Sequence, residues 1–436
     1  MRKPIFALAL VLAAFSSCSS STTSPTGDGV PTTGDYVVLA WNDLGMHCLN
    51  PTYDQAVVLP PYNNLWAQVI QRGNPPRVVT AGLTVEFSLE DNTFSYGKRD
   101  YGQFWDNAVA LFGDIFGPGG LEHDKGLTGT GLSGEMEQSG DHFVAEAIPV
   151  VPVNDSDVWS PYQVAVIVVK NAAGDELIRT KAIVPVSDEI DCSKCHGADP
   201  WADIIEKHDE EHATALADTV PFLCALCHGS PALGSVTPGS SGIFLSKAIH
   251  GSHADRLATC YDCHPGQVTQ CSRSERHTAT GGNCETCHGS MQQVADRITG
   301  GVLPWVDEPR CAQCHDHSVV AGVATPGALY RNSTGHGGVY CAACHNSPHV
   351  MYPSLLLADN YQPRQYHGSS HRVKTIGSCG VCHSDSRGEV GEIGEFGEAH
   401  GGSSPEHKNA CHTCHTVVPT DTSKWPHSYQ WNNSND

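Results

Sequence analysis

The pattern of apolar and polar residues changes near residue 188. Before it, short runs alternate or are rich in β-branched residues, which predicts strands. These runs are 36–40, 83–89, 142–148, 162–170 and 177–186. The last two flank the turn sequence Asn171-Ala-Ala-Gly-Asp175, and so predict a hairpin. Short strands between Gly, Pro and Asp turns are typical of a sandwich, so we predict a β-sandwich-like domain over residues 36–188.

From residue 189 onward the strand patterns fade, while cysteine and histidine become dense. We predict that residues 189–436 form a second, mostly irregular domain with short helices. The whole chain has 19 cysteines and 25 histidines, and only 39% of its residues are hydrophobic. Something other than aliphatic side chains must therefore fill part of the interior.

The N-terminal residues predict an export signal. Arg2 and Lys3 precede an apolar run, 5–15, that is too short to span a bilayer but fits a signal-peptide core. The sequence Phe15-Ser-Ser-Cys18 resembles a bacterial lipobox, so we predict a signal over residues 1–18 with a lipid anchor at Cys18. Plain cleavage near Ser17 is the alternative. Residues 19–35, rich in Ser, Thr, Pro and Gly, predict a flexible tether.

The sequence Cys-x-x-Cys-His occurs eight times at irregular spacing, so the chain is not a solenoid of equal repeats. The motifs are Cys192-Cys195-His196, Cys224-Cys227-His228, Cys260-Cys263-His264, Cys284-Cys287-His288, Cys311-Cys314-His315, Cys341-Cys344-His345, Cys379-Cys382-His383 and Cys411-Cys414-His415.

This motif has the chemistry of covalent haem attachment. Its two thiols add to the vinyl groups of the porphyrin, and the adjacent histidine is the proximal iron ligand. Structural zinc or a disulfide framework would use the cysteines but would give no reason for a histidine after each pair. We therefore predict eight covalently bound c-type haems (heme c), and the second domain becomes an octahaem cytochrome c domain.

The motifs leave little protein for each haem. Residues 192–415 provide 224 residues, or 28 for each of the eight motifs. That is too few to build a separate aliphatic core or to insulate one haem from the next. We therefore expect the porphyrins to form the core and to lie close enough to pass electrons.

A second axial ligand would separate an electron carrier from an enzyme, since an open iron position permits substrate chemistry. Fourteen histidines between residues 208 and 427 lie outside the proximal positions, and several are flanked by Gly, which lets the backbone approach a porphyrin. The preferred distal ligands are His212, His250, His253, His277, His336, His367, His400 and His407. With histidine in surplus, methionine ligation by Met291 or Met351 is disfavoured.

The motif series resembles the multihaem c-type cytochromes of metal-respiring bacteria. The resemblance covers residues 190–416, including stretches such as Cys260-Tyr-Asp-Cys-His-Pro-Gly and the run from Tyr340 to His349. It implies bis-histidine ligation and an electron-carrier role between periplasm, outer-membrane complexes and extracellular or mineral acceptors. Octahaem enzymes often replace one motif histidine by lysine, whereas all eight motifs here end in histidine.

We therefore predict an exported electron-transfer protein rather than an enzyme. It would be an outer-membrane lipoprotein facing the periplasm or the cell surface, with redox proteins or extracellular acceptors as partners. The net charge of −22 argues against nucleic-acid binding. The alternatives are an octahaem oxidoreductase with one substrate-accessible haem, and a self-associating subunit of a cytochrome filament.

Two cysteines of residues 36–436, Cys48 and Cys271, lie outside the motifs. The sequence Met46-His47-Cys48 holds three metal-binding residue types, but neighbouring strand residues point to opposite faces, which favours a structural role. A Cys48–Cys271 disulfide is allowed in an exported protein. The glutamate-rich segment 388–398 predicts a solvated loop.

Overall fold

The computed structural model describes residues 34–73, 76–256, 258–266, 268–279, 284–303, 305–309, 329–367, 376, 381–382, 415–417 and 430–431. The predicted signal over residues 1–18 and all but the last two residues of the predicted tether over 19–35 lie outside these residues, as does the loop 388–398. None of the helices in the described ranges is long and apolar enough to cross a membrane.

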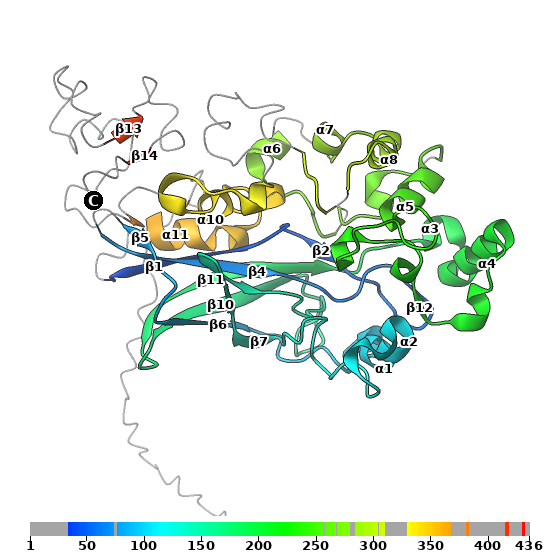
Figure 1. The fold of residues 1–436 in the computed structure, drawn as a ribbon, viewed down its shortest axis with the longest axis horizontal. Coiled ribbons are helices and arrows are strands. Elements are labelled where there is room, and N and C mark those ends of the chain that lie inside the picture. The colour runs from blue at the N-terminus through cyan, green and yellow to red at the C-terminus, as the bar shows by residue number, and fades with distance from the viewer. Residues whose placement is uncertain are drawn as a thin grey trace, which may run out of the picture.

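The N-terminal third contains two five-stranded sheets (Figure 1). The first has the order β1-β4-β9-β8, with β5 also paired to β4: β1 Tyr36–Asn42, β4 Leu65–Gln71, β5 Arg77–Val78, β8 Glu137–Ser139 and β9 His142–Ala145. The second has the order β2-β11-β10-β6-β7: β2 His47–Cys48, β6 Leu83–Leu89, β7 Ser133–Glu135, β10 Tyr162–Asn171 and β11 Glu176–Ser187. All pairs are antiparallel except β2 with β11.

The predicted hairpin is confirmed, because β10 and β11 pair antiparallel from Tyr162–Pro185 to Lys170–Glu176. Buried residues alternate along β10, as expected for a strand with one face on a core. Side chains from both sheets, such as Val69 and Ile167, share one large apolar cluster. A shared core between two sheets is the arrangement of a sandwich.

Short helices and connecting segments make up the rest of the described chain. Before residue 190 they are η1 Arg99–Gly102, α1 Gln103–Asp106, α2 Ala108–Phe112 and η2 Gly113–Phe116. After it, the α-helices are α3 Ser193–His196, α4 Pro200–His212, α5 Leu245–His253, α6 Glu275–Ala279, α7 Cys284–His288, α8 Met291–Thr299, α10 Cys341–His345 and α11 Tyr361–His367. The 3-10 turns are η3 Leu216–Thr219, η4 Cys224–Leu226, η5 Pro231–Leu233, η6 Cys260–Asp262, η8 Tyr330–Asn332, η9 His336–Gly338, η10 Pro348–Val350 and η11 Leu357–Asn360.

Two pairs of short strands complete the described elements. Strand β3 (Ala56–Val57) pairs with β12 (Phe222–Leu223), and so joins the N-terminal third to the region of the second motif. Strands β13 (His415–Val417) and β14 (Gln430–Trp431) pair near the C-terminus.

Strand β1 is buried on both of its faces. Val38 and Ala40 belong to the sandwich core, whereas Leu39 and Trp41 face a second apolar cluster. That second cluster includes residues that follow the fifth motif: Ala342, Ala343, Tyr352, Tyr366, Ile376 and Val381. Helices α10 and α11 accordingly lie over β1 in Figure 1. The motif-bearing region therefore packs directly on the first sheet.

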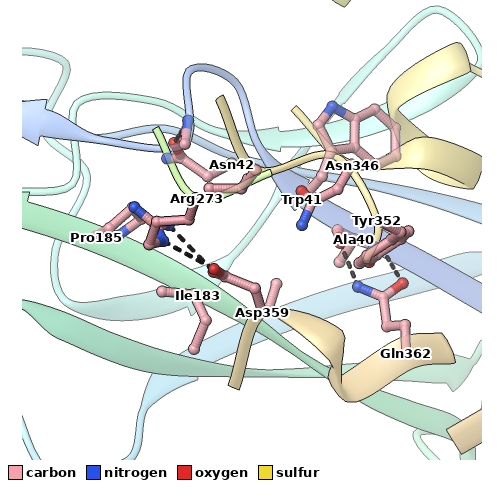
Figure 2. Close-up of a pocket in the computed structure, with 13 residues that line it drawn as sticks. Ala40, Trp41, Asn42, Ile183, Pro185, Arg273, Asn346, Tyr352, Asp359 and Gln362 are labelled. Carbon is pink, nitrogen blue, oxygen red and sulfur yellow. Dashed lines mark hydrogen bonds and ion pairs between the residues drawn. The ribbon is translucent and has the colours of Figure 1, made fainter. Parts of the chain in front are cut away.

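A buried ion pair lies at the same contact. The side chains of Arg273 and Asp359 are each 2% exposed and form a two-pronged pair, with Nε to Oδ2 at 2.8 Å and Nη2 to Oδ1 at 3.1 Å. They line a cavity with β1 and β11 residues such as Trp41 and Ile183 (Figure 2). The cavity holds about 10 Å³, room for roughly one water molecule, so it is no ligand site.

Around motifs one to four the described chain has little apolar core of its own. Apart from prolines, its buried apolar side chains between residues 190 and 309 are Trp201, Ile205, Leu223, Leu245, Ala295 and Ile298. The sandwich cluster alone holds 33. Mixed sheets and short helices thus match the predicted fold class in outline.

Candidate haem-attachment sites

Each described motif forms one helical turn. In the first, the amide of His196 donates to the carbonyl of Cys192 at 3.0 Å, and His228 and His264 repeat this bond with Cys224 and Cys260. The motifs at Cys284–His288 and Cys341–His345 are short α-helices. One turn brings residues i, i+3 and i+4 to the same side, so both thiols and the imidazole share a face.

The motif cysteines are accessible. Cys195, Cys227 and Cys287 are exposed, and the other described motif cysteines are partly exposed. Leu226, inside the second motif, is 56% exposed, and Tyr261, inside the third, is 40% exposed. Apolar side chains left uncovered beside paired thiols are what a site for a large apolar group presents.

Four motif histidines each lie beside a further histidine. The ring centres are 6.1 to 6.3 Å apart in all four pairs: His196 with His253, His228 with His208, His264 with His250, and His288 with His349.

This separation fits two imidazoles bound to one iron from opposite sides. An iron–nitrogen bond of about 2 Å on each side, with each ring centre about 1 Å beyond its nitrogen, places the two centres roughly 6 Å apart. The described part of the chain has no group of three or more His, Cys, Asp or Glu that would hold a metal ion unaided. Two imidazoles supply only two ligands, so each ring pair fits a metal whose other ligands come from a cofactor.

Hydrogen bonds orient six of the eight rings through Nδ1. The partners are Asp203 Oδ2 for His196 (2.6 Å), Ser241 Oγ for His228 (2.9 Å), the Ser246 carbonyl for His250 (2.7 Å), the Ile249 carbonyl for His253 (2.7 Å), Thr214 Oγ1 for His208 (2.9 Å) and the Leu44 carbonyl for His349 (2.8 Å). A Nδ1–H that donates to a carbonyl or carboxylate leaves the Nε2 lone pair free for a metal, the usual second-shell arrangement.

Burial keeps the remaining two rings neutral. It lowers the pKa of His264 to about 4, helped by the charges of His250 and His349. It likewise lowers the pKa of His288 to about 4, with His349 and Arg297 adding to the effect. Neutral imidazole is the form that ligates metals.

An open hollow of about 300 Å³ lies beside the fourth motif. It is lined by His288, Gly289, Gln293, Asp296 and Arg297, which lie at the end of α7 and along α8. The hollow adjoins the ring of a motif histidine, where an attached cofactor would lie.

The first, third and fourth motifs are neighbours in space. Helix α5 supplies His253 to the first motif and His250 to the third, from positions three residues apart on one side of the helix. Lys194 in the first motif forms an ion pair with Asp262 in the third. Burial raises the pKa of Cys260 in the third motif, and the nearby charge of Cys284 in the fourth raises it further.

The second motif joins this row through α4. The helix begins at Pro200 after the cap of Asp199, whose side chain accepts from the Ala202 amide. In its first turn, Asp203 contacts His196 of the first motif, and in its second half His208 lies beside His228 of the second. The order in space is therefore second, first, third, fourth.

Sequence reasoning placed some of these ligands and missed others. Of the predicted distal histidines, His250 and His253 lie beside motif histidines. His212 is exposed at the end of α4, and its ring lies 4.9 Å from His208, which instead pairs with His228. His277 lies in α6, near His349, whose pKa is lowered mainly by burial, with the charges of Arg273 and His277 adding to the effect.

His208 and His349 were not among the predicted ligands. The sequence does offer a clue for His349, because it follows Pro348 and lies only four residues after the motif histidine His345. His208 has only its position on the amphipathic helix, which does not distinguish it from His212. The side chains of His336 and His367, and all of His400 and His407, lie outside the described residues, as do the fifth motif and most of the seventh and eighth.

His47 has a structural environment. Its Nε2 lies 2.7 Å from Asp43 Oδ1, and Asn64 donates to the other carboxylate oxygen at 2.8 Å. Burial would raise the pKa of Asp43, but the charge and hydrogen bond of His47 hold it below its usual value. The Asp43–His47 pair is satisfied within the fold, in line with the structural role predicted for this segment.

Comparisons with known proteins identify no family. No family model matches the chain, and no curated protein matches it. A solved structure, MtrC from Shewanella baltica OS185, aligns with a TM-score of 0.15 and 13% identity over 61% of this chain and 45% of that chain. The chain thus spans less than half of that protein, and the likeness is too low to support any conclusion about fold or function.

Proposed function

We propose that this chain is a multihaem c-type cytochrome that relays electrons through eight closely packed, mainly bis-histidine haems. The observation that carries the proposal is the set of four histidine pairs, each with ring centres 6.1 to 6.3 Å apart, each including a Cys-x-x-Cys-His histidine. The scarcity of apolar core between residues 190 and 309 supports it, because bound porphyrins would supply the missing interior.

The chain's own residues would hold and tune the cofactors. In each described motif the two cysteines would form thioether bonds, and the adjacent histidine would ligate from one side. His208, His250, His253 and His349 would ligate from the other side. Haem, when bound, supplies one-electron oxidation and reduction at its iron.

A second histidine beside four of the motif histidines favours an electron carrier over an enzyme. An iron held by imidazoles on both faces has no position left for a substrate. The row of second, first, third and fourth motifs supports transfer from site to site, since neighbouring motifs share a helix, an ion pair or nearby cysteines. An octahaem oxidoreductase would need one open haem.

The cellular setting is part of the proposal. The N-terminal signal with Cys18 supports an exported outer-membrane lipoprotein, on the periplasmic or surface face. The net charge of −22 suits docking to basic redox proteins, while extracellular or mineral acceptors are alternatives. A filament subunit would use self-association at the exposed surface.

Two measurements on the full chain, matured with haem, test the proposal. Mass spectrometry of the denatured protein should show eight haems attached. Electron paramagnetic resonance of the oxidised protein should show low-spin signals only. Fewer than eight haems would refute the octahaem assignment. A stable high-spin signal that shifts on adding nitrite or cyanide would support the oxidoreductase instead.

A further inference from the structure

The two cysteines outside the motifs meet where the second sheet contacts the motif region. Cys48 lies in β2 and is the register partner of Ser187 in β11. Cys271 lies two residues after Thr269, whose hydroxyl donates to the Ser187 hydroxyl at 2.9 Å. Ser187 is thus next to Cys48 on one side and bonded to the Cys271 segment on the other.

The segment before Cys271 is held firmly at this contact. The amides of Val268 and Thr269 donate to the two carboxylate oxygens of Glu189 at 3.1 and 2.9 Å. The amide of Gln270 donates to the Tyr162 hydroxyl at 3.0 Å. The charge of Glu189 also helps burial to raise the pKa of Cys48. The same carboxylate therefore lies near both cysteine-bearing segments.

Cys271 lies near enough to Cys48 to affect the pKa of the Cys48 thiol. Burial raises the pKa of Cys48, and the charge of Cys271 raises it further. Burial raises the pKa of Cys271 to about 11. Both are partly buried thiols in the structure. Neither belongs to an attachment motif, so haem maturation leaves both available.

We propose that Cys48 and Cys271 form a disulfide that ties the sheets to the motif region. The bond forms by exchange with a disulfide of a thiol oxidoreductase or an oxidised small thiol. Both S–H bonds break, one S–S bond forms, and the donor disulfide takes up two electrons and two protons to become two thiols. The bond closes a loop across 223 positions (271 minus 48), and long loops gain the most from a cross-link.

Peptide mapping of the unreduced, haem-loaded chain tests the proposal without any substitution. The denatured protein is alkylated with iodoacetamide and digested. The expected product joins the peptides containing Cys48 and Cys271, and it separates after reduction. Alkylation of both cysteines before reduction would overturn the proposal. So would a link of Cys48 to Cys18, or of Cys271 to Cys284.

Serine variants give a second test with a built-in control. In Cys48→Ser, Cys271 should become alkylated, and Cys271→Ser should free Cys48 in the same way. The melting temperature should fall by several degrees in either variant, and the double variant should be no worse than either one. An additive loss would overturn the proposal. The haem count should stay at the wild-type value, so this result is independent of the proposed function.

Discussion

At the residue scale, the site depends on which histidine faces which. His250 and His253 differ by three positions, yet the first lies beside His264 and the second beside His196. The carbonyls of Ser246 and Ile249, one turn back in the same helix, hold the two rings in parallel fashion. A single short helix therefore provides ligands to two different sites.

We expect His250→Ala and His253→Ala each to open one haem, and not the same one. Each variant should convert about one haem in eight to the high-spin form, because one axial ligand is lost. Paramagnetic resonance of the oxidised proteins measures this, and the double variant should show twice the signal. An unchanged low-spin spectrum in either single variant would contradict the assignment.

His208 and His212 form a matched pair for the second motif. His208→Ala should produce a high-spin haem, since its ring lies 6.2 Å from His228. His212→Ala, at an exposed neighbouring position on the same helix, should leave the spectrum unchanged. A high-spin haem in His212→Ala but not in His208→Ala would show that His212, the ligand predicted from the sequence, is the correct one.

The Asp203 carboxylate should set the potential of the first site. It lies 2.6 Å from His196 Nδ1, and its negative charge favours the oxidised state. Asp203→Asn should raise one haem potential by on the order of 50 mV, near the 59 mV per tenfold change for one electron. Spectroelectrochemical titration measures it. Glu206→Gln, at an exposed position on the same helix, is the control and should leave that potential unchanged.

At the element scale, α11 covers the free edge of β1. The strand pairs with β4 along one side only. Along the other side, Gln362 accepts from the Ala40 amide at 3.0 Å and donates to its carbonyl, while the Tyr366 hydroxyl bonds both the amide and the carbonyl of Val38. These side chains satisfy a strand edge that would otherwise invite pairing with another chain.

Removing the Gln362 amide should therefore be costly. Gln362→Ala leaves the buried amide and carbonyl of Ala40 without partners, which costs about 1–3 kcal/mol. Denaturant unfolding gives the loss, and hydrogen exchange should show faster exchange at the Ala40 amide. Arg364→Ala, an exposed position on the same helix, should change stability by less than about 0.5 kcal/mol. Equal effects of the two substitutions would argue against edge protection.

At the scale of the whole molecule, the sheets and the motif region fold as one packed unit. Strand β1 contributes to two apolar clusters, and the Arg273–Asp359 pair lies buried against β1 and β11. Arg273 also stacks over the Tyr162 ring, 4.9 Å from its centre. The N-terminal third and the motif region therefore share one packed interface.

Breaking the buried Arg273–Asp359 pair should test how much this interface contributes to stability. Asp359→Asn leaves Arg273 as an uncompensated buried charge and should cost about 3–5 kcal/mol in unfolding free energy. Replacing both residues, as in Arg273→Met with Asp359→Leu, should recover most of the loss because no charge remains buried. Denaturant unfolding of the single and double variants distinguishes these outcomes; equal losses in both would show that shape, not charge, matters.

The sequence predicted the strands and the motifs better than the way they meet. The sequence marked β1, β6, β9 and the β10–β11 hairpin by alternating or β-branched runs, and in β10 the alternation reflects one buried face. It could not show that β1 is buried on both faces, since Leu39 and Trp41 have partners over 300 positions away. The prediction of distal ligands was wrong at the second motif, because sequence spacing does not distinguish His208 from His212.

The most direct test of the central claim is an experimental structure of the haem-loaded chain. We expect one iron between the rings of each pair, His196–His253, His228–His208, His264–His250 and His288–His349, with the haems in the order second, first, third, fourth. Motif cysteines paired as disulfides or zinc ligands, or motif histidines without a second imidazole opposite, would contradict the account.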